Sequence, residues 1–231
     1  VVATVKALKL HGNIEEKDLK EENIEALAAG VANLEKHVEN MKKYNLPVVV
    51  ALNVFVTDTE KELAFLEEWA ANQGVELSRT EVWEHGGAGG LDLAKKVIRA
   101  IDNNKEDLKL LYSDETPIAE KIEIICREMY GADGVNLTDE VKVEIARIEK
   151  LGFGSLPVCM AKTPASLTDN AKIKGRPTGF KITINDVKLR SGAGFVVAYA
   201  NKVLTMPGLP KVPSALNIDI DEETETILGI F

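Results

Sequence analysis

Hydrophobic and polar positions alternate along the first hundred residues in blocks that predict strands and helices in turn. Predicted strands cover residues 1–5, 47–52 and 75–82. Apolar residues spaced three and four apart predict helices over residues 22–44 and 58–72, and a third helix from the glycine-rich segment 86–90 to about residue 101. This order predicts a parallel α/β sheet, whose ligands bind beyond the carboxyl ends of the strands.

The remainder of the chain has a different pattern. Helical spacing predicts helices over residues 116–130 and 138–151, and short β-prone runs cover residues 157–161, 180–184 and 194–199 within a segment rich in glycine and proline. We therefore predict an α/β protein with parallel-sheet layers and flanking helices, followed by a smaller, irregular α+β region. The predicted domains are residues 1–105 and residues 106–231.

Composition narrows the function classes. The chain has 231 residues and a net charge of -9, so it lacks the basic excess that most nucleic-acid binders need. No run of about 18 apolar residues is present, which argues against a membrane span. The first residues lack a signal-peptide pattern, and we expect a cytoplasmic protein. Cys126 and Cys159 make no disulfide framework, and we expect both to be small buried thiols.

The first residue also carries an expectation. Residue 1 is Val rather than Met, and it lies inside an apolar, β-prone run. We expect the chain to be the C-terminal part of something longer. An uncovered strand at residues 1–5 would then be prone to edge-to-edge association.

Several catalytic motifs are missing from the sequence. It contains no G-x-x-x-x-G-K-[ST] phosphate loop, no H-E-x-x-H or paired C-x-x-C zinc motif, and no G-x-S-x-G elbow. We therefore predict no metal site. The three histidines are weak candidates: His37 is at the boundary of an apolar helix face, His11 is undecided, and His85 is close to a candidate loop.

The loop after the buried strand at residues 47–52 offers two candidate residues. The Asn53 amide combines a donor and an acceptor that match the edge of a purine or pterin. Phe55 lies in a polar loop, where it either stacks on a ligand or fills the core. A turn-capping role for Asn53 is the alternative.

The loop after residues 75–82 offers a third candidate. Trp83 provides a flat face for stacking, and Gly86–Gly90 would let a ligand approach the backbone at a helix start. A core tryptophan beside a plain turn is the alternative. Because the two loops follow consecutive predicted strands, Phe55 and Trp83 could line one slot.

Several strings of the sequence resemble one family. They run in order from the first residue to the last and include VVVALNVFVTDTEKE, EVWEHGGAGGLDLA, MYGADGV, LPVCMAKT and MPGLPKVPSA. With these motifs the chain resembles the C-terminal portion of formate–tetrahydrofolate ligase. The resemblance implies that the chain forms one half of a P-loop NTPase-like fold, and that this half lacks the phosphate loop.

The resemblance also implies an activity. The family is an ATP-dependent ligase that makes formyl phosphate from formate and ATP and passes the formyl group to tetrahydrofolate. Mg²⁺, a monovalent cation, a homotetrameric assembly and a phosphate-binding N-terminal part are implied for the intact enzyme. The isolated chain is expected to be inactive, with small-molecule substrates and neither a nucleic acid nor a membrane as partner.

Site residues follow from the matching motifs. Phe55 in ALNVF and Trp83 in EVW match the aromatic pair that flanks the folate ring, and Asn53 matches a base-recognition position. Many members carry a basic residue and a proline where this chain has Val54 and Val56. We therefore do not infer the geometry of this loop from the family.

Two rival functions stay open: a non-catalytic folding or assembly module, and a stand-alone folate- or nucleotide-binding domain. Exposure of Trp83 discriminates between a ligand-binding ring and a buried contact. The sequence assigns no role to His11, Lys162 or the proline-rich loop at residues 206–213.

Overall fold

The structure is a computed structural model that describes residues 1–161, 165–200, 209–224 and 226–229. Lys162 and part of the proline-rich loop, residues 206–208, lie outside the described residues. The chain divides into two compact units, Val1–Asn201 and Lys202–Phe231. The predicted domain boundary at residues 105 and 106 stays a prediction.

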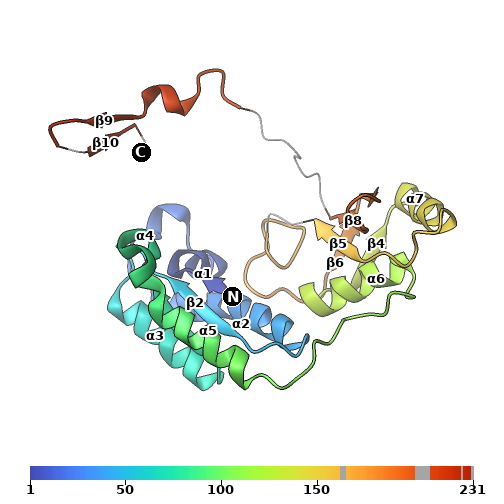
Figure 1. The fold of residues 1–231 in the computed structure, drawn as a ribbon, viewed down its shortest axis with the longest axis horizontal. Coiled ribbons are helices and arrows are strands. Elements are labelled where there is room, and N and C mark those ends of the chain that lie inside the picture. Colours follow the sequence, from blue (N-terminus) through green and yellow to red (C-terminus); the bar gives the residue numbers. More distant parts are fainter. Residues whose placement is uncertain (162–164, 201–208, 225, 230–231) are drawn as a thin grey trace. The chain divides into compact units, whose positions relative to one another are not determined.

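The first part of the larger unit is a parallel sheet flanked by helices (Figure 1). Strands are paired in the order β1-β2-β3 and comprise β1 (Val2–Ala3), β2 (Val49–Asn53) and β3 (Glu76–Thr80). Helices α1 (Val5–His11), α2 (Ile24–Lys42), α3 (Glu60–Asn72), α4 (Val82–His85) and α5 (Leu91–Asn103) complete this region. The predicted parallel α/β arrangement is confirmed.

The chain start differs from the prediction. Only Val2 and Ala3 pair with the sheet, and Val5–His11 is helix α1 rather than strand. The reason is local: the Thr4 side chain accepts a hydrogen bond from the Ala7 N–H at 3.0 Å and caps the helix. His11 is the last residue of this helix.

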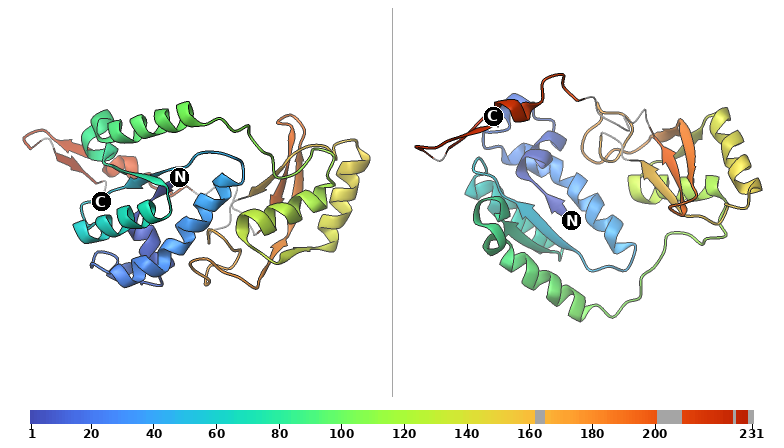
Figure 2. Two further views of the ribbon diagram at one scale, coloured as in Figure 1. Left: turned by 90° about the horizontal axis from the view of Figure 1, so that it is seen from below. Right: turned by 45° about the horizontal axis from the view of Figure 1, so that its top comes forward.

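Two glycines let α1 and α2 pack backbone against backbone. A Cβ atom at Gly30 would lie 1.8 Å from the carbonyl oxygen of Leu8, and one at Gly12 would lie 1.9 Å from that of Ala26. Only glycine fits such contacts. Figure 2 shows the ribbons of this region, in which helices surround the sheet. Apolar side chains of α1, α2 and α3 are buried in one core with those of the strands.

The second part of the larger unit has its own core. It contains α6 (Ile118–Ile125), a π-helical turn (Cys126–Tyr130), β4 (Gly134–Leu137), α7 (Asp139–Lys150), β5 (Val158–Ala161), β6 (Lys181–Ile184), β7 (Asp186–Arg190) and β8 (Phe195–Tyr199). Strands β4 and β6 are parallel, as are β5 and β8, whereas β7 is antiparallel to β8. The sequence pattern predicted neither β4 nor β7.

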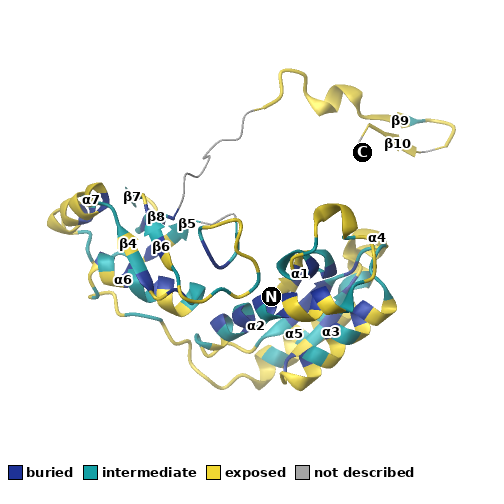
Figure 3. Cartoon of the chain, turned by 180° about the vertical axis from the view of Figure 1, so that it is seen from behind, coloured by how far each residue is buried: buried dark blue, intermediate teal, exposed yellow. Residues whose placement is uncertain are grey.

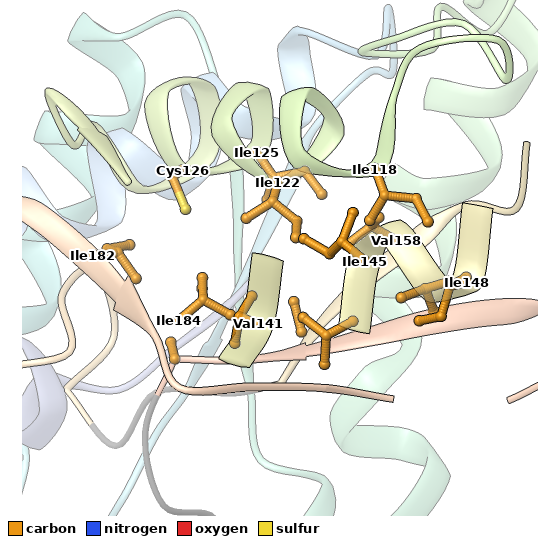
Figure 4. Packing of buried hydrophobic residues seen from close by; sticks show 14 of the residues in the cluster. Ile118, Ile122, Ile125, Cys126, Val141, Ile145, Ile148, Val158, Ile182 and Ile184 are labelled. Carbon is orange, nitrogen blue, oxygen red and sulfur yellow. The ribbon is translucent and has the colours of Figure 1, made fainter. Parts of the chain in front are cut away.

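Isoleucines dominate this second core. Figure 4 shows side chains of α6, α7 and β6 facing one another, among them Ile122, Ile145 and Ile184. Cys126 is buried in this core, and burial raises the pKa of its thiol to about 12. Cys159 is exposed, so the expectation that both thiols are buried was wrong for Cys159.

The smaller unit, described by itself, is a short hairpin. Strands β9 (Asp219–Asp221) and β10 (Thr226–Leu228) are antiparallel and follow a 3-10 turn at Ser214–Asn217. In the described parts of the chain, no helix is both long enough and apolar enough to cross a bilayer.

Candidate functional site

The loops after β2 and β3 lie side by side because the two strands are parallel neighbours. Asn53, the last residue of β2, is opposite Thr80, the last residue of β3. The Val54 N–H donates to the Thr80 carbonyl at 3.0 Å, and the Thr80 hydroxyl donates to the Leu52 carbonyl at 3.0 Å. These bonds fix the two loops to each other at the carboxyl edge of the sheet.

Phe55 is held by a tight turn within the first loop. The Asp58 N–H donates to the Phe55 carbonyl at 2.9 Å, and the Asp58 carboxylate accepts the Phe55 N–H at 2.9 Å. Burial raises the pKa of Asp58, while the hydrogen bond from Phe55 opposes that shift. The Phe55 ring is only partly buried, so the loop presents it rather than hiding it in the core.

Lys6 adds a charge that sequence reasoning missed. Its Nζ lies 4.8 Å from the centroid of the Phe55 ring, within the range of a cation–π contact. Because residues 1–5 were predicted as a strand, helix α1, which carries Lys6, was not predicted. The signal that could have found it is the Thr4 cap, which places Lys6 on helix α1.

Trp83 belongs to the second loop, but not to a strand end. Strand β3 ends at Thr80, and Val82–His85 forms the one-turn helix α4. The indole Nε1–H donates to the Val54 carbonyl at 3.0 Å, which joins Trp83 to the residue beside Phe55. With 57% of its surface exposed, Trp83 is not a core residue of this chain.

In the glycine-rich segment, the backbone packing requires glycine at position 89. A Cβ atom at Gly89 would lie 2.5 Å from the Glu81 carbonyl oxygen, so the loop folds back on itself only with glycine there. The Glu81 N–H donates to the Gly89 carbonyl at 3.2 Å. Gly86 has a φ of 56°, a value that glycine adopts at little cost. The expected helix, α5, follows directly.

The histidines lie elsewhere or make weak contacts. His85 Nε2 is 3.9 Å from a Glu81 carboxylate oxygen, and both side chains are exposed. His37 Nε2 is 3.0 Å from the Ser166 hydroxyl, and burial lowers the pKa of His37. His11 Nδ1 accepts the Gly175 N–H at 3.1 Å, and burial likewise lowers its pKa. The contacts of His37 and His11 join distant segments of the chain.

The comparison with protein families covers the whole chain. The family described as formate–tetrahydrofolate ligase matches residues 1–231. The chain belongs to this family. Formate–tetrahydrofolate ligases are enzymes of folate one-carbon chemistry, and they use tetrahydrofolate and ATP. The side-by-side loops that carry Asn53, Phe55 and Trp83 therefore belong to a protein with a flat heterocyclic substrate.

Proposed function

We propose that this chain forms the folate-binding wall of a formate–tetrahydrofolate ligase, with the pterin ring stacked between Phe55 and Trp83. The proposal is carried by one observation: the Trp83 indole is exposed and hydrogen-bonded at 3.0 Å to Val54, the residue next to Phe55. An anchored, exposed ring on a loop bonded to the loop that carries Phe55 is suited to stack a flat ligand.

The proposed role is positioning. By analogy with base stacking, each aromatic ring contributes about 1–3 kcal/mol of binding free energy. Holding the pterin fixes the nitrogen that accepts the formyl group, and fixed geometry lowers the barrier of group transfer. Lys6 already covers one face of Phe55, so the ligand would stack on the opposite face.

We further propose that Asn53 contacts the edge of a nucleotide base. It is half-buried at the end of β2, where its amide can both donate and accept. ATP is a substrate of the family, and its adenine edge has the complementary pattern.

The phosphoryl chemistry is assigned to other parts of the intact enzyme. Among the described residues, no group of three or more His, Cys, Asp or Glu side chains could hold a metal ion. We derive no step through Mg²⁺ from these residues. We propose that an N-terminal part supplies the contacts to formyl phosphate, and that the intact enzyme is a homotetramer with a monovalent cation.

The rival assembly function requires Trp83 to be buried in a domain or subunit contact. Its exposure within this chain favours the folate proposal over a contact inside the chain. A ligand titration separates the two functions directly.

The test is tryptophan fluorescence during titration with tetrahydrofolate, corrected for absorption by the ligand. Wild type is compared with Trp83→Phe, and Trp69, which packs partly buried against the first core, is the built-in control. We expect saturable quenching in wild type that disappears in Trp83→Phe. Saturable quenching that persists in the variant would contradict the stacking proposal. The chain alone should make no 10-formyltetrahydrofolate, and its formation from ATP and formate would contradict the predicted inactivity.

A further inference from the structure

A loop between β5 and β6 lies on two helices of the first core. Residues 165–176 of this loop, which we call the strap, make hydrogen bonds with residues of α1 and α2. Within the strap, Leu167 and Thr168 are 2% and 1% exposed, so this segment is packed rather than extended into solvent. Because β5 and β6 belong to the second core, the strap joins the two cores of the larger unit.

Asn33 of α2 holds the strap near both of its ends. Asn33 is 5% exposed, and its Nδ2 donates to the Gly175 carbonyl oxygen at 2.9 Å and to the Ser166 hydroxyl oxygen at 3.1 Å. Ser166 has a φ of 66°, an uncommon value for a residue with a side chain, and the docked position supplies contacts that support it. An amide does not titrate, so the bonds of Asn33 do not depend on pH.

The contact of His11 does depend on its protonation. The Gly175 N–H donates to His11 Nδ1 at 3.1 Å. A ring nitrogen accepts a hydrogen bond only when it carries no proton, so the neutral ring has its proton on Nε2. In a protonated ring, the N–H of Nδ1 would face the N–H of Gly175. This bond is therefore lost when His11 takes up a proton.

His37 supports the Ser166 end in a similar way. Its Nε2 lies 3.0 Å from the Ser166 hydroxyl oxygen, whereas Asn33 Oδ1 lies 3.5 Å from that oxygen. Since the hydroxyl accepts from Asn33 Nδ2, its own proton is best directed to the nearer acceptor, His37 Nε2. Protonation of His37 would turn the hydroxyl toward the longer contact and weaken this end of the strap.

The described charged groups that act on the two rings are cationic. Burial lowers the pKa of His11, and Lys174 of the strap and His37 of α2 lower it further. Burial and the neighbouring Lys36 lower the pKa of His37. Both rings are therefore easier to protonate when the strap leaves them, and proton uptake favours the released strap.

An ion pair ties the strap to α2 independently of the histidines. The Arg176 guanidinium donates to the Glu39 carboxylate at 2.8 and 2.7 Å and lies 3.6 Å from the Glu35 carboxylate. The arginine side chain is long, so the Gly175 backbone can leave His11 while Arg176 remains attached. The contact between Gly175 and His11 is thus the point at which the strap responds to protonation.

We propose that the strap is a pH-sensitive clasp between the two cores, closed on α1 and α2 while His11 and His37 are neutral and released at Gly175 when His11 is protonated. The clasp does not use Asn53, Phe55 or Trp83, so it goes beyond the proposed folate wall. An unperturbed histidine titrates near pH 6.5. Because the closed state lowers the histidine pKa, the closed state is stabilised above about pH 6.5, and this stabilisation is lost as pH falls through the lowered value.

The test is amide hydrogen exchange followed by NMR, expressed as protection factors so that the intrinsic pH dependence of exchange is removed. We expect the protection factor of the Gly175 amide to fall about tenfold from pH 7.5 to pH 5. His11→Asn offers an acceptor, Oδ1, in place of Nδ1 but does not titrate, so this fall should shrink to less than about threefold. His85→Asn is the matched control, because His85 is exposed, and it should keep the full fall.

A second readout decides the test if His11→Asn does not fold. In wild type, the ring nitrogen signals of His11 and the amide signal of Gly175 should shift with the same midpoint as the pH is lowered. The proposal is overturned if the two midpoints differ, if Gly175 protection stays constant, or if His11→Asn shows the same fall as wild type. An equal fall at the Leu66 amide of α3 would also overturn it, because the whole fold would then be loosening.

Discussion

Helices α3 and α5 have the same length, 13 residues each, and yet they relate to the core in opposite ways. α3 buries Leu63, Leu66 and Ala70 against the sheet. α5 buries no residue, and its apolar side chains Leu91, Ile98 and Ile101 are exposed (Figure 3). An apolar stripe along a helix therefore predicts the helix but does not specify what covers the stripe.

The polar contacts of the two helices differ in the same way. In α3, the buried Glu62 carboxylate accepts hydrogen bonds from Lys9 Nζ at 2.8 Å and from the N–H groups of Asn23 and Thr59, each at 3.1 Å. In α5, the exposed Asp92 accepts from the Ser78 hydroxyl at 2.6 Å and from Lys96 Nζ at 2.7 Å. Burial should make the first network far more important for stability.

The largest expected effect comes from breaking the buried ion pair. Lys9→Met removes the cation from a pair in which Lys9 is 1% and Glu62 is 0% exposed. We expect a loss of about 3–5 kcal/mol in the free energy of unfolding, because the carboxylate remains buried and unpaired. Urea denaturation measures it. Lys96→Met, in the partly exposed pair of α5, is the control and should cost at most about 1 kcal/mol. Equal losses of unfolding free energy in Lys9→Met and Lys96→Met would contradict the proposed difference between α3 and α5.

A core truncation in α3 should have the next largest effect. Leu66→Ala deletes a fully buried side chain, and we expect a loss of about 2–5 kcal/mol in the free energy of unfolding. The measurement is again urea denaturation, with an unchanged m-value as the sign of an intact native state. A loss below about 1 kcal/mol would mean that α3 packs more loosely than its burial indicates.

The pH dependence of stability sharpens the comparison further. Burial alone would raise the pKa of Glu62, but hydrogen bonds from Lys9, Thr59 and Asn23 outweigh it, so the folded-state pKa lies below the ordinary value. A lowered pKa stabilises the fold above the unfolded pKa of about 4.3, and that stabilisation is lost as pH falls through the folded pKa.

Unfolding measured from pH 7 down to pH 3 checks this expectation. The stability advantage of wild type over Glu62→Gln should shrink as the pH falls. An advantage that stays constant over this range would show that Glu62 does not titrate as proposed. Asp92→Asn is the control in α5, and its difference from wild type should be smaller throughout.

The smallest expected effect is on the exposed stripe of α5. Ile98 is 57% exposed, so Ile98→Ala should change the free energy of unfolding by no more than about 0.5 kcal/mol. Urea denaturation at several protein concentrations checks it. A loss comparable to that of Leu66→Ala would show that the stripe is covered in solution.

The sequence predicted the parts of the fold that depend on neighbouring residues. The run at residues 47–52 predicted β2, and helical spacing predicted α2, α3, α6 and α7. It missed α1 because β-prone valines precede the Thr4 cap. It missed β4 and β7 because their sequences, GVNL and DVKLR, mix apolar with polar residues and contain no run of β-prone residues. It named Phe55 and Trp83 but extended the strand to Val82 and placed Trp83 in the loop after it, because a one-turn helix has too few residues to show a period.

By itself, the sequence determined the alternation of strands and helices from β2 to α5, the two candidate loops and the family motifs, because these depend on local patterns. Only the tertiary structure decided which polar atoms are paired. The Lys9–Glu62 pair joins residues 53 positions apart, and the Asn40–Met129 bond joins residues 89 positions apart. Such contacts depend on how helices pack against each other. The paired residues are too far apart along the chain for a local sequence pattern to predict the pairing.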